Sequence, residues 1–113
     1  MKELNIGDQI VRVRATPLAL IFYNQEFNSD LIGDLVKFRD ISEDLSKLDT
    51  VAILKLIWAM AKADSFGKSF PSFEGWVATL EFIDFSDSQF LAAAMEEAQN
   101  GFFRKSGVKG AIK

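Results

Sequence analysis

Side chains that could do chemistry are scarce in this chain of 113 residues. It contains no Cys and no His, which excludes disulfides, thiolate nucleophiles and Cys-ligated metal sites and removes the commonest general base. Two groups of acids, within 43–49 and at 96–97, have the residue types of a general acid and base pair. Carboxylates at these spacings far more often form helix caps or solvated helix faces, so we expect no catalytic residues.

Metal and cofactor motifs are equally weak. The segment 84–87 (DFSD) could hold a hard cation through oxygen, but it lacks the spacing of a calcium loop and suits a helix N-cap better. Neither GxGxxG nor GxxxxGK[ST] is present, and no serine lies in a GxSxG turn. We therefore expect no metal, no cofactor and no enzymatic activity.

Aromatic residues are the most informative side chains. They make up 12% of the chain, and several fall in a loop or near the chain end, where contact surfaces are commonly found. The alternative is that the loop over 65–72 simply folds onto the core. The candidate partner-binding residues are Trp58, Phe66, Phe70, Phe73, Trp76, Phe102 and Phe103.

The composition indicates one globular domain over 1–103, followed by a flexible basic tail over 104–113. Hydrophobic residues make up 49% and charged residues 26% of the chain, and the net charge is −3. The domain carries −7 and the tail +4, so the domain should repel nucleic acid. The longest apolar stretch, 51–61, is short of the ~18–20 residues that span a membrane.

The elements that carry these side chains begin with a β-hairpin over 3–14. Gly7-Asp8 between two β-prone runs is a two-residue turn signal. Val11 and Val13 share one face, and Ile10, Arg12 and Arg14 share the other.

Five helices are expected after the hairpin, at about 17–27, 29–41, 50–64, 73–83 and 87–100. Thr16-Pro17 and Ser72 are N-terminal signals, and Asn100-Gly101 is a C-cap pair. The fold class is helix-dominated α+β: a short N-terminal β-hairpin followed by about five α-helices in a compact bundle.

The helix over 50–64 is apolar almost all round. Such a helix is either the centre of the core or covered on one face by a partner chain. We expect it to be the centre of stability, with Trp58 largely buried. It also leads us to expect self-association, as a dimer or larger, through this helix or the hairpin.

The order of motifs resembles the tail assembly chaperones of long-tailed bacteriophages and prophages of Gram-positive bacteria. Each motif alone is unspecific, but their order and spacing cover nearly the whole chain. The segments that carry the resemblance are 15–17 (ATP), 23–31 (YNQEFNSDL), 47–50 (KLDT), 55–62 (KLIWAMAK), 70–76 (FPSFEGW) and 100–104 (NGFFR).

The resemblance implies a non-enzymatic protein of the bacterial host cytoplasm. Such chaperones bind the tape measure protein, recruit tail tube subunits in some systems and are absent from the finished virion. For a helical client, we expect an apolar groove with the helix over 50–64 as its floor.

Two other classes remain open at the level of sequence. One is a structural virion component, such as a head–tail connector subunit. The other is a small helical regulator that binds nucleic acid through the basic tail together with Arg12 and Arg14.

Overall fold

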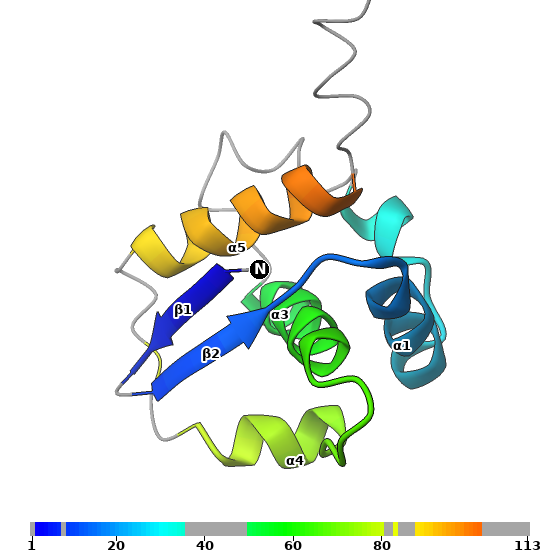
Figure 1. Cartoon of the computed structure of the whole chain (residues 1–113), viewed down its shortest axis with the longest axis horizontal. Helices are drawn as coiled ribbons and strands as arrows, with labels where there is room; N and C mark the ends of the chain where they lie inside the picture. The colour runs from blue at the N-terminus through cyan, green and yellow to red at the C-terminus, as the bar shows by residue number, and fades with distance from the viewer. Residues whose placement is uncertain (1, 8, 36–49, 81–82, 84–87, 103–113) are drawn as a thin grey trace, which may run out of the picture.

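The computed structural model describes residues 2–7, 9–35, 50–80, 83 and 88–102. Figure 1 shows an N-terminal antiparallel hairpin followed by helices, so the expected helix-dominated α+β fold is confirmed. Residues 31–35 are also helical. The elements with defined bounds are β1 (Lys2–Ile6), β2 (Gln9–Val13), α1 (Pro17–Phe27), α3 (Thr50–Asp64), α4 (Phe73–Ala78) and α5 (Ser88–Phe102).

The hairpin has one buried face and one exposed face. Leu4 pairs with Val11, and Ile6 with Gln9 beside the turn. Gly7 has a φ of 62°, a left-handed conformation that favours glycine in a two-residue turn. Leu4, Ile6, Val11 and Val13 are buried, whereas Ile10 is 66% exposed. The division of faces expected from the sequence is therefore confirmed.

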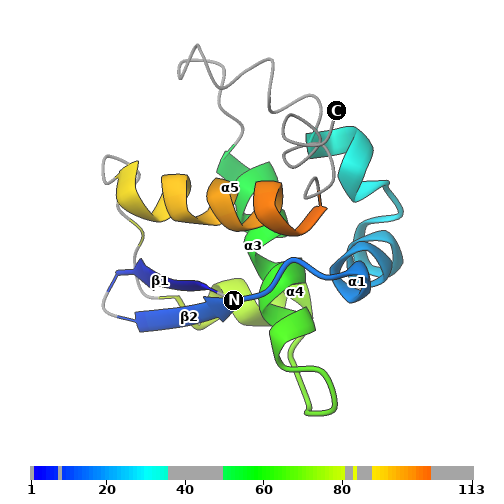
Figure 2. The same ribbon diagram turned by 45° about the horizontal axis from the view of Figure 1, so that its top comes forward.

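The helix α3 is the centre of the core. It packs against β2, α1 and α4, and Figure 2 shows it running through the middle of the molecule. Residues 56–61 are all buried, and Trp58 has no exposed surface. The expectation that α3 forms the floor of an open groove is met only at its end, where Ala61 and Asp64 line a groove; the chain's own elements cover its middle. Of its large apolar side chains, Val51 near its start stays half exposed.

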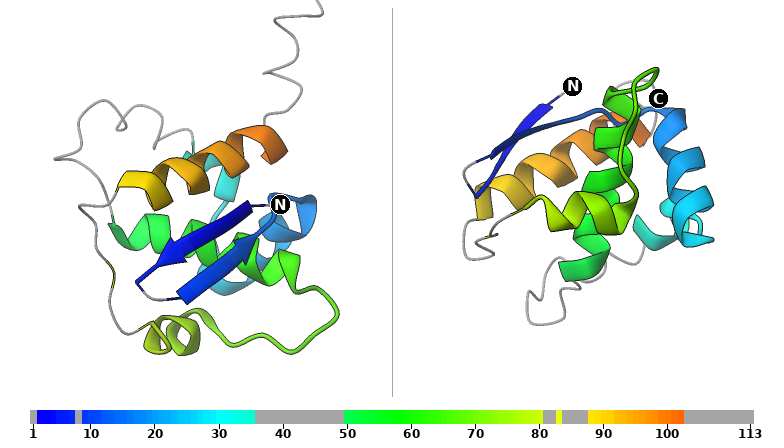
Figure 3. Two further views of the ribbon diagram at one scale, coloured as in Figure 1. Left: turned by 60° about the vertical axis from the view of Figure 1, so that its left-hand side comes forward. Right: turned by 90° about the horizontal axis from the view of Figure 1, so that it is seen from below.

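The hairpin lies over α3 between two other helices. In the left view of Figure 3, α5 runs along the β1 side and α4 lies beyond the β2 side. The two strands therefore contact different helices: α5 packs against β1, and α3 packs against β2. This arrangement covers the inner face of a two-stranded sheet, which would be marginal alone in water.

The helix α1 has the bounds that its flanking residues predict. Thr16 is extended (φ −124°, ψ 167°), Pro17 is the first helical residue, and Asn28 is left-handed at φ 53°. The capping contact itself is missing: the Thr16 hydroxyl oxygen is buried without a hydrogen-bond partner in the described part of the chain. Thr16 is therefore a cap in backbone conformation only.

Two predicted helix ends are wrong. The helix predicted over 73–83 ends at Ala78, where the Thr79 hydroxyl donates to the Trp76 carbonyl. The helix predicted to end at Asn100-Gly101 continues to Phe102. The helix predicted over 29–41 is described only for 31–35, and the tail over 104–113 lies outside the described residues.

Candidate protein-binding surface

The seven aromatic candidates do not form one surface. Trp58 and Trp76 are buried, whereas Phe66 is 67% exposed. Phe70, Phe73 and Phe102 are partly buried and pack against the core. Phe103 lies outside the described residues. Trp58 and Trp76 thus belong to the core, and Phe66 presents the most surface to a partner.

Two of the candidates belong to an aromatic cluster that fixes the loop after α3. Phe27 contacts Trp58 at 5.4 Å and Phe73 at 5.0 Å between ring centroids, both edge to face. The Trp58 indole N–H donates to the Pro71 carbonyl at 3.1 Å. Such edge-to-face pairs contribute about 0.5–1.5 kcal/mol beyond their burial. This part of the loop therefore folds onto the core, as the alternative interpretation of the sequence holds.

A groove of about 460 Å³ lies between β2 and the segment that follows α3. One wall is formed by residues 9–12 of β2, and the other by the loop after α3 and by α4. A hydrogen bond of 2.7 Å from the Gln9 side chain to the Thr79 carbonyl links the two walls. The remaining lining residues are Ala61, Asp64, Ser65, Lys68, Phe70 and Trp76.

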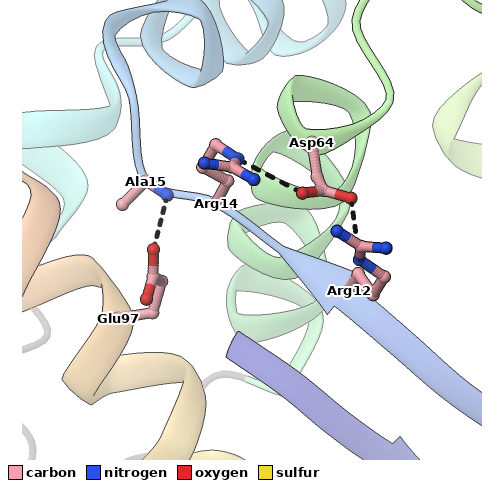
Figure 4. Close-up of polar contacts among 5 residues, drawn as sticks. All are labelled: Arg12, Arg14, Ala15, Asp64 and Glu97. Atoms are coloured by element: carbon pink, nitrogen blue, oxygen red, sulfur yellow. Dashed lines mark hydrogen bonds and ion pairs between the residues drawn. The ribbon is translucent and has the colours of Figure 1, made fainter. Parts of the chain in front are cut away.

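An ion-pair cluster stands beside the groove (Figure 4). Asp64 forms ion pairs with both arginines: its Oδ2 lies 3.4 Å from the Nε of Arg12, and its Oδ1 lies 3.2 Å from the Nε of Arg14. The Asp64 side chain is 9% exposed, while about half of each arginine side chain is exposed. Asp64 is the last residue of α3, where a negative charge is unfavourable to the helix dipole. The two guanidinium groups offset that effect and tie β2 to the end of α3.

A second buried carboxylate holds the strand exit against α5. The Ala15 backbone N–H donates to Glu97 Oε2 at 3.0 Å, and Glu97 is 8% exposed. Its neighbour Glu96 is exposed and pairs with Lys2 at 2.5 Å. One carboxylate thus accepts from the backbone and the other pairs with a surface lysine, so each has a structural contact of its own.

The groove contains no metal constellation. Among the residues described, no group of three or more His, Cys, Asp or Glu side chains could hold a metal ion. The acids within 43–49 and the segment 84–87 lie outside those residues. In the same described ranges, the helices are too short or too polar to cross a membrane.

The described residues that line the groove provide apolar rings, a strand edge and charged side chains.

The sequence analysis missed the groove as a unit. Its walls come from residues separated by about fifty positions or more, namely β2 and the segment 61–79. One signal was present: Ile10 stands on the polar face of its strand, beside Arg12. A large apolar side chain on an otherwise polar face marks a contact surface when it stays exposed after folding.

No family model, curated protein or solved structure matches this chain.

Proposed function

We propose that this chain is an assembly chaperone of a long-tailed bacteriophage or prophage. In this role it binds the tape measure protein, and also tail tube subunits, in the cytoplasm of the bacterial host, without catalysis and as a self-associating protein. The proposal rests on the motifs that resemble that family, and one structural observation supports it. Ile10, which is 66% exposed, lines one side of the groove, and Phe66, which is 67% exposed, belongs to the loop on the other side, between the lining residues Ser65 and Lys68.

These two side chains have the chemistry of a protein contact. Large apolar groups that stay in water after folding are stabilised when a partner covers them, by about 25 cal/mol per Å² of apolar surface. Phe70, partly buried, continues this apolar surface into the groove. A chaperone needs such a surface, because its client exposes apolar residues until assembly is complete.

The same geometry disfavours the nucleic-acid alternative. Arg12 and Arg14 were its basic surface within the domain, and both pair with Asp64. The Asp64 carboxylate offsets part of the positive charge of these two groups and so lowers the potential that a phosphate backbone would meet.

Co-expression with the long helical protein encoded just downstream tests the proposal. We expect soluble co-purification of the two proteins, with binding weakened about tenfold by Phe66→Ser, because central aromatic contacts contribute 1–2 kcal/mol or more. Ile21→Ser is the matched control, since Ile21 is half exposed on α1 and does not line the groove. A downstream protein that is equally soluble alone and never co-purifies would show that the proposal is wrong.

A further inference from the structure

We infer that the edge of β2 binds an extended acidic segment of a protein partner, which joins the hairpin as a third strand. This goes beyond the proposed function, because it names a mode of binding and does not require that the partner be a tape measure protein. Strand addition of this kind combines main-chain hydrogen bonds with pockets for alternate side chains.

The direction of the backbone groups along β2 carries the inference. Ile6 and Gln9 form the pair beside a two-residue turn, and such a pair exchanges hydrogen bonds. By alternation, Ile10 and Arg12 point their N–H and C=O groups away from β1. Arg14, next in this series, shows the direction: its N–H donates to the Met60 carbonyl of α3 at 3.0 Å.

The two earlier residues of the series face the groove. Ile10 and Arg12 line it, and within the described part of the chain their outward backbone groups have no hydrogen-bond partner. Backbone N–H and C=O groups are strong hydrogen-bonding groups, and an unpaired strand edge is a template for another chain.

An added strand suits the edge of β2 better than a helix does. A strand lies ~4.8 Å from its neighbour and rises ~3.3 Å per residue, so four residues cover the length of β2 from Gln9 to Arg12. A helix is about 10 Å wide and would leave the edge of β2 without partners. Phe70 and Trp76 in the facing wall would contact the side chains of the added segment.

The charges in the groove favour an acidic segment. Of the charged residues that line it, Arg12 and Asp64 already pair with each other. Lys68 is exposed and has no carboxylate partner among the residues described. The uncompensated charge of this groove is therefore positive, and an Asp or Glu in the bound segment complements it.

A bare segment fits this edge better than a second copy of the chain. The groove is walled by α4, which is held to β2 by the bond from Gln9 to Thr79. In a symmetric pair, each copy would have to bring its own α4 into the same space. An extended segment carries no such helix beside it.

Selection from a displayed library of short random peptides tests the inference with the full chain. We expect the enriched peptides to alternate β-branched or aromatic residues with at least one acid. Ile10→Pro removes one outward N–H and should weaken their binding about tenfold. Ile10→Val keeps that N–H and should bind as the wild type does. Asn5→Pro makes the same change opposite Ile10, on the other edge of the hairpin, and should also leave binding unchanged.

Two further measurements decide the outcome if Ile10→Pro does not fold. Bound peptide should slow hydrogen exchange at the amides of Ile10 and Arg12 but not at those of Glu3 and Asn5. Lys68→Glu should weaken the binding of acidic peptides at low salt.

Several results would overturn the inference. These are a library that yields no enriched peptide, peptides that bind Ile10→Pro as well as wild type, protection confined to β1, or a wild-type dimer that Ile10→Pro dissociates. Co-purification of the downstream protein that is insensitive to Ile10→Pro would overturn this binding mode while leaving the proposed function intact.

Discussion

Replacing Gly101 with Ala should destabilise this protein, although the same change usually stabilises a helix. Gly101 lies inside α5, where Gly→Ala ordinarily gains about 1 kcal/mol of helix propensity. A Cβ at this position would overlap the carbonyl oxygen and the Cβ of Ala15 and would lie 2.9 Å from its carbonyl carbon. Two of these three atoms belong to the backbone, so a change of rotamer cannot relieve the overlap.

The expected magnitude follows from two opposing terms. Overpacking of this kind costs about 1–3 kcal/mol. Moving α5 away from Ala15 also strains the hydrogen bond from its N–H to Glu97, a charge-assisted bond worth about 1.5–3 kcal/mol. After the gain in helix propensity, the net loss should be about 2 kcal/mol, which lowers the melting temperature by on the order of 10 °C.

Gly33→Ala is the matched control. Gly33 lies in the helical segment 31–35, and among the described residues the atom nearest to its added Cβ would be a carboxylate oxygen of Asp30 at 3.4 Å. This variant should gain about 0.5–1 kcal/mol. Urea denaturation followed by circular dichroism measures both changes. If Gly101→Ala were as stable as Gly33→Ala, the close approach of α5 to the strand exit would be refuted.

Three further substitutions test the core and the buried carboxylates by the same denaturation assay. Ile57→Ala should cost about 2–5 kcal/mol because Ile57 is fully buried, whereas Val51→Ala at the half-exposed start of α3 should cost much less; equal losses would contradict the layout. Glu97→Ala leaves a buried backbone N–H unpaired and should cost about 1–3 kcal/mol, whereas Glu96→Ala should change stability by less than about 0.5 kcal/mol; the reverse order would contradict the assigned roles. Asp64→Asn should cost about 1 kcal/mol at low salt and less at high salt, because it leaves two half-exposed arginines unpaired; a loss that does not depend on salt would contradict an electrostatic role.

Local signals predicted the starts of α1 and α4 and the end of α1, whereas a distant partner contacts the end of α4. Pro17, Asn28 and Ser72 act through their own neighbours; the Ser72 hydroxyl, for example, accepts from the Gly75 N–H at 3.2 Å. The early end of α4 involves the bond from Gln9 to the Thr79 carbonyl, seventy residues away. The pattern of apolar residues within 73–83 therefore could not predict this contact or the early end of α4.

The glycine at the end of α5 shows the same limit. Next to Asn100 it has the sequence of a C-cap, yet α5 passes through Gly101 to Phe102. The glycine is needed there because Ala15 lies against the helix. A sequence pattern gives the conformational freedom of a glycine, but only the packing shows whether the freedom serves a turn or a close approach.

The groove could be predicted only in part, for a related reason. The alternation in β2 correctly placed Ile10, Arg12 and Arg14 on one face, but the pairing of both arginines with Asp64 depends on how the hairpin crosses α3. The sequence offered the same two alternatives for Phe66 and Trp76, contact with a partner or burial in the core. In the structure Phe66 is exposed and Trp76 is buried.

The two lysines of α3 lie over aromatic rings where α3 packs against α1. In the sequence they only interrupt the apolar pattern. In the structure, Lys62 lies over the rings of Phe22 at 4.7 Å and Trp58 at 5.2 Å, and Lys55 lies over Phe27 at 5.1 Å. In each contact the ammonium nitrogen itself lies over the ring, and such a contact is worth about 0.5–1 kcal/mol at exposed sites.

This packing changes where a partner can bind. An all-round apolar helix suggests a surface that a second chain must cover, but here α1, β2 and α4 pack against α3, and residues 56–61 are buried. Among the described residues, the two most exposed large apolar side chains are Ile10, which lines the groove along β2, and Phe66, in the loop on its other side; Ile21 and Val51 are about half exposed. Because apolar burial drives association only where surface is still exposed, we propose that a partner binds at this groove, to which α3 contributes only its last turn.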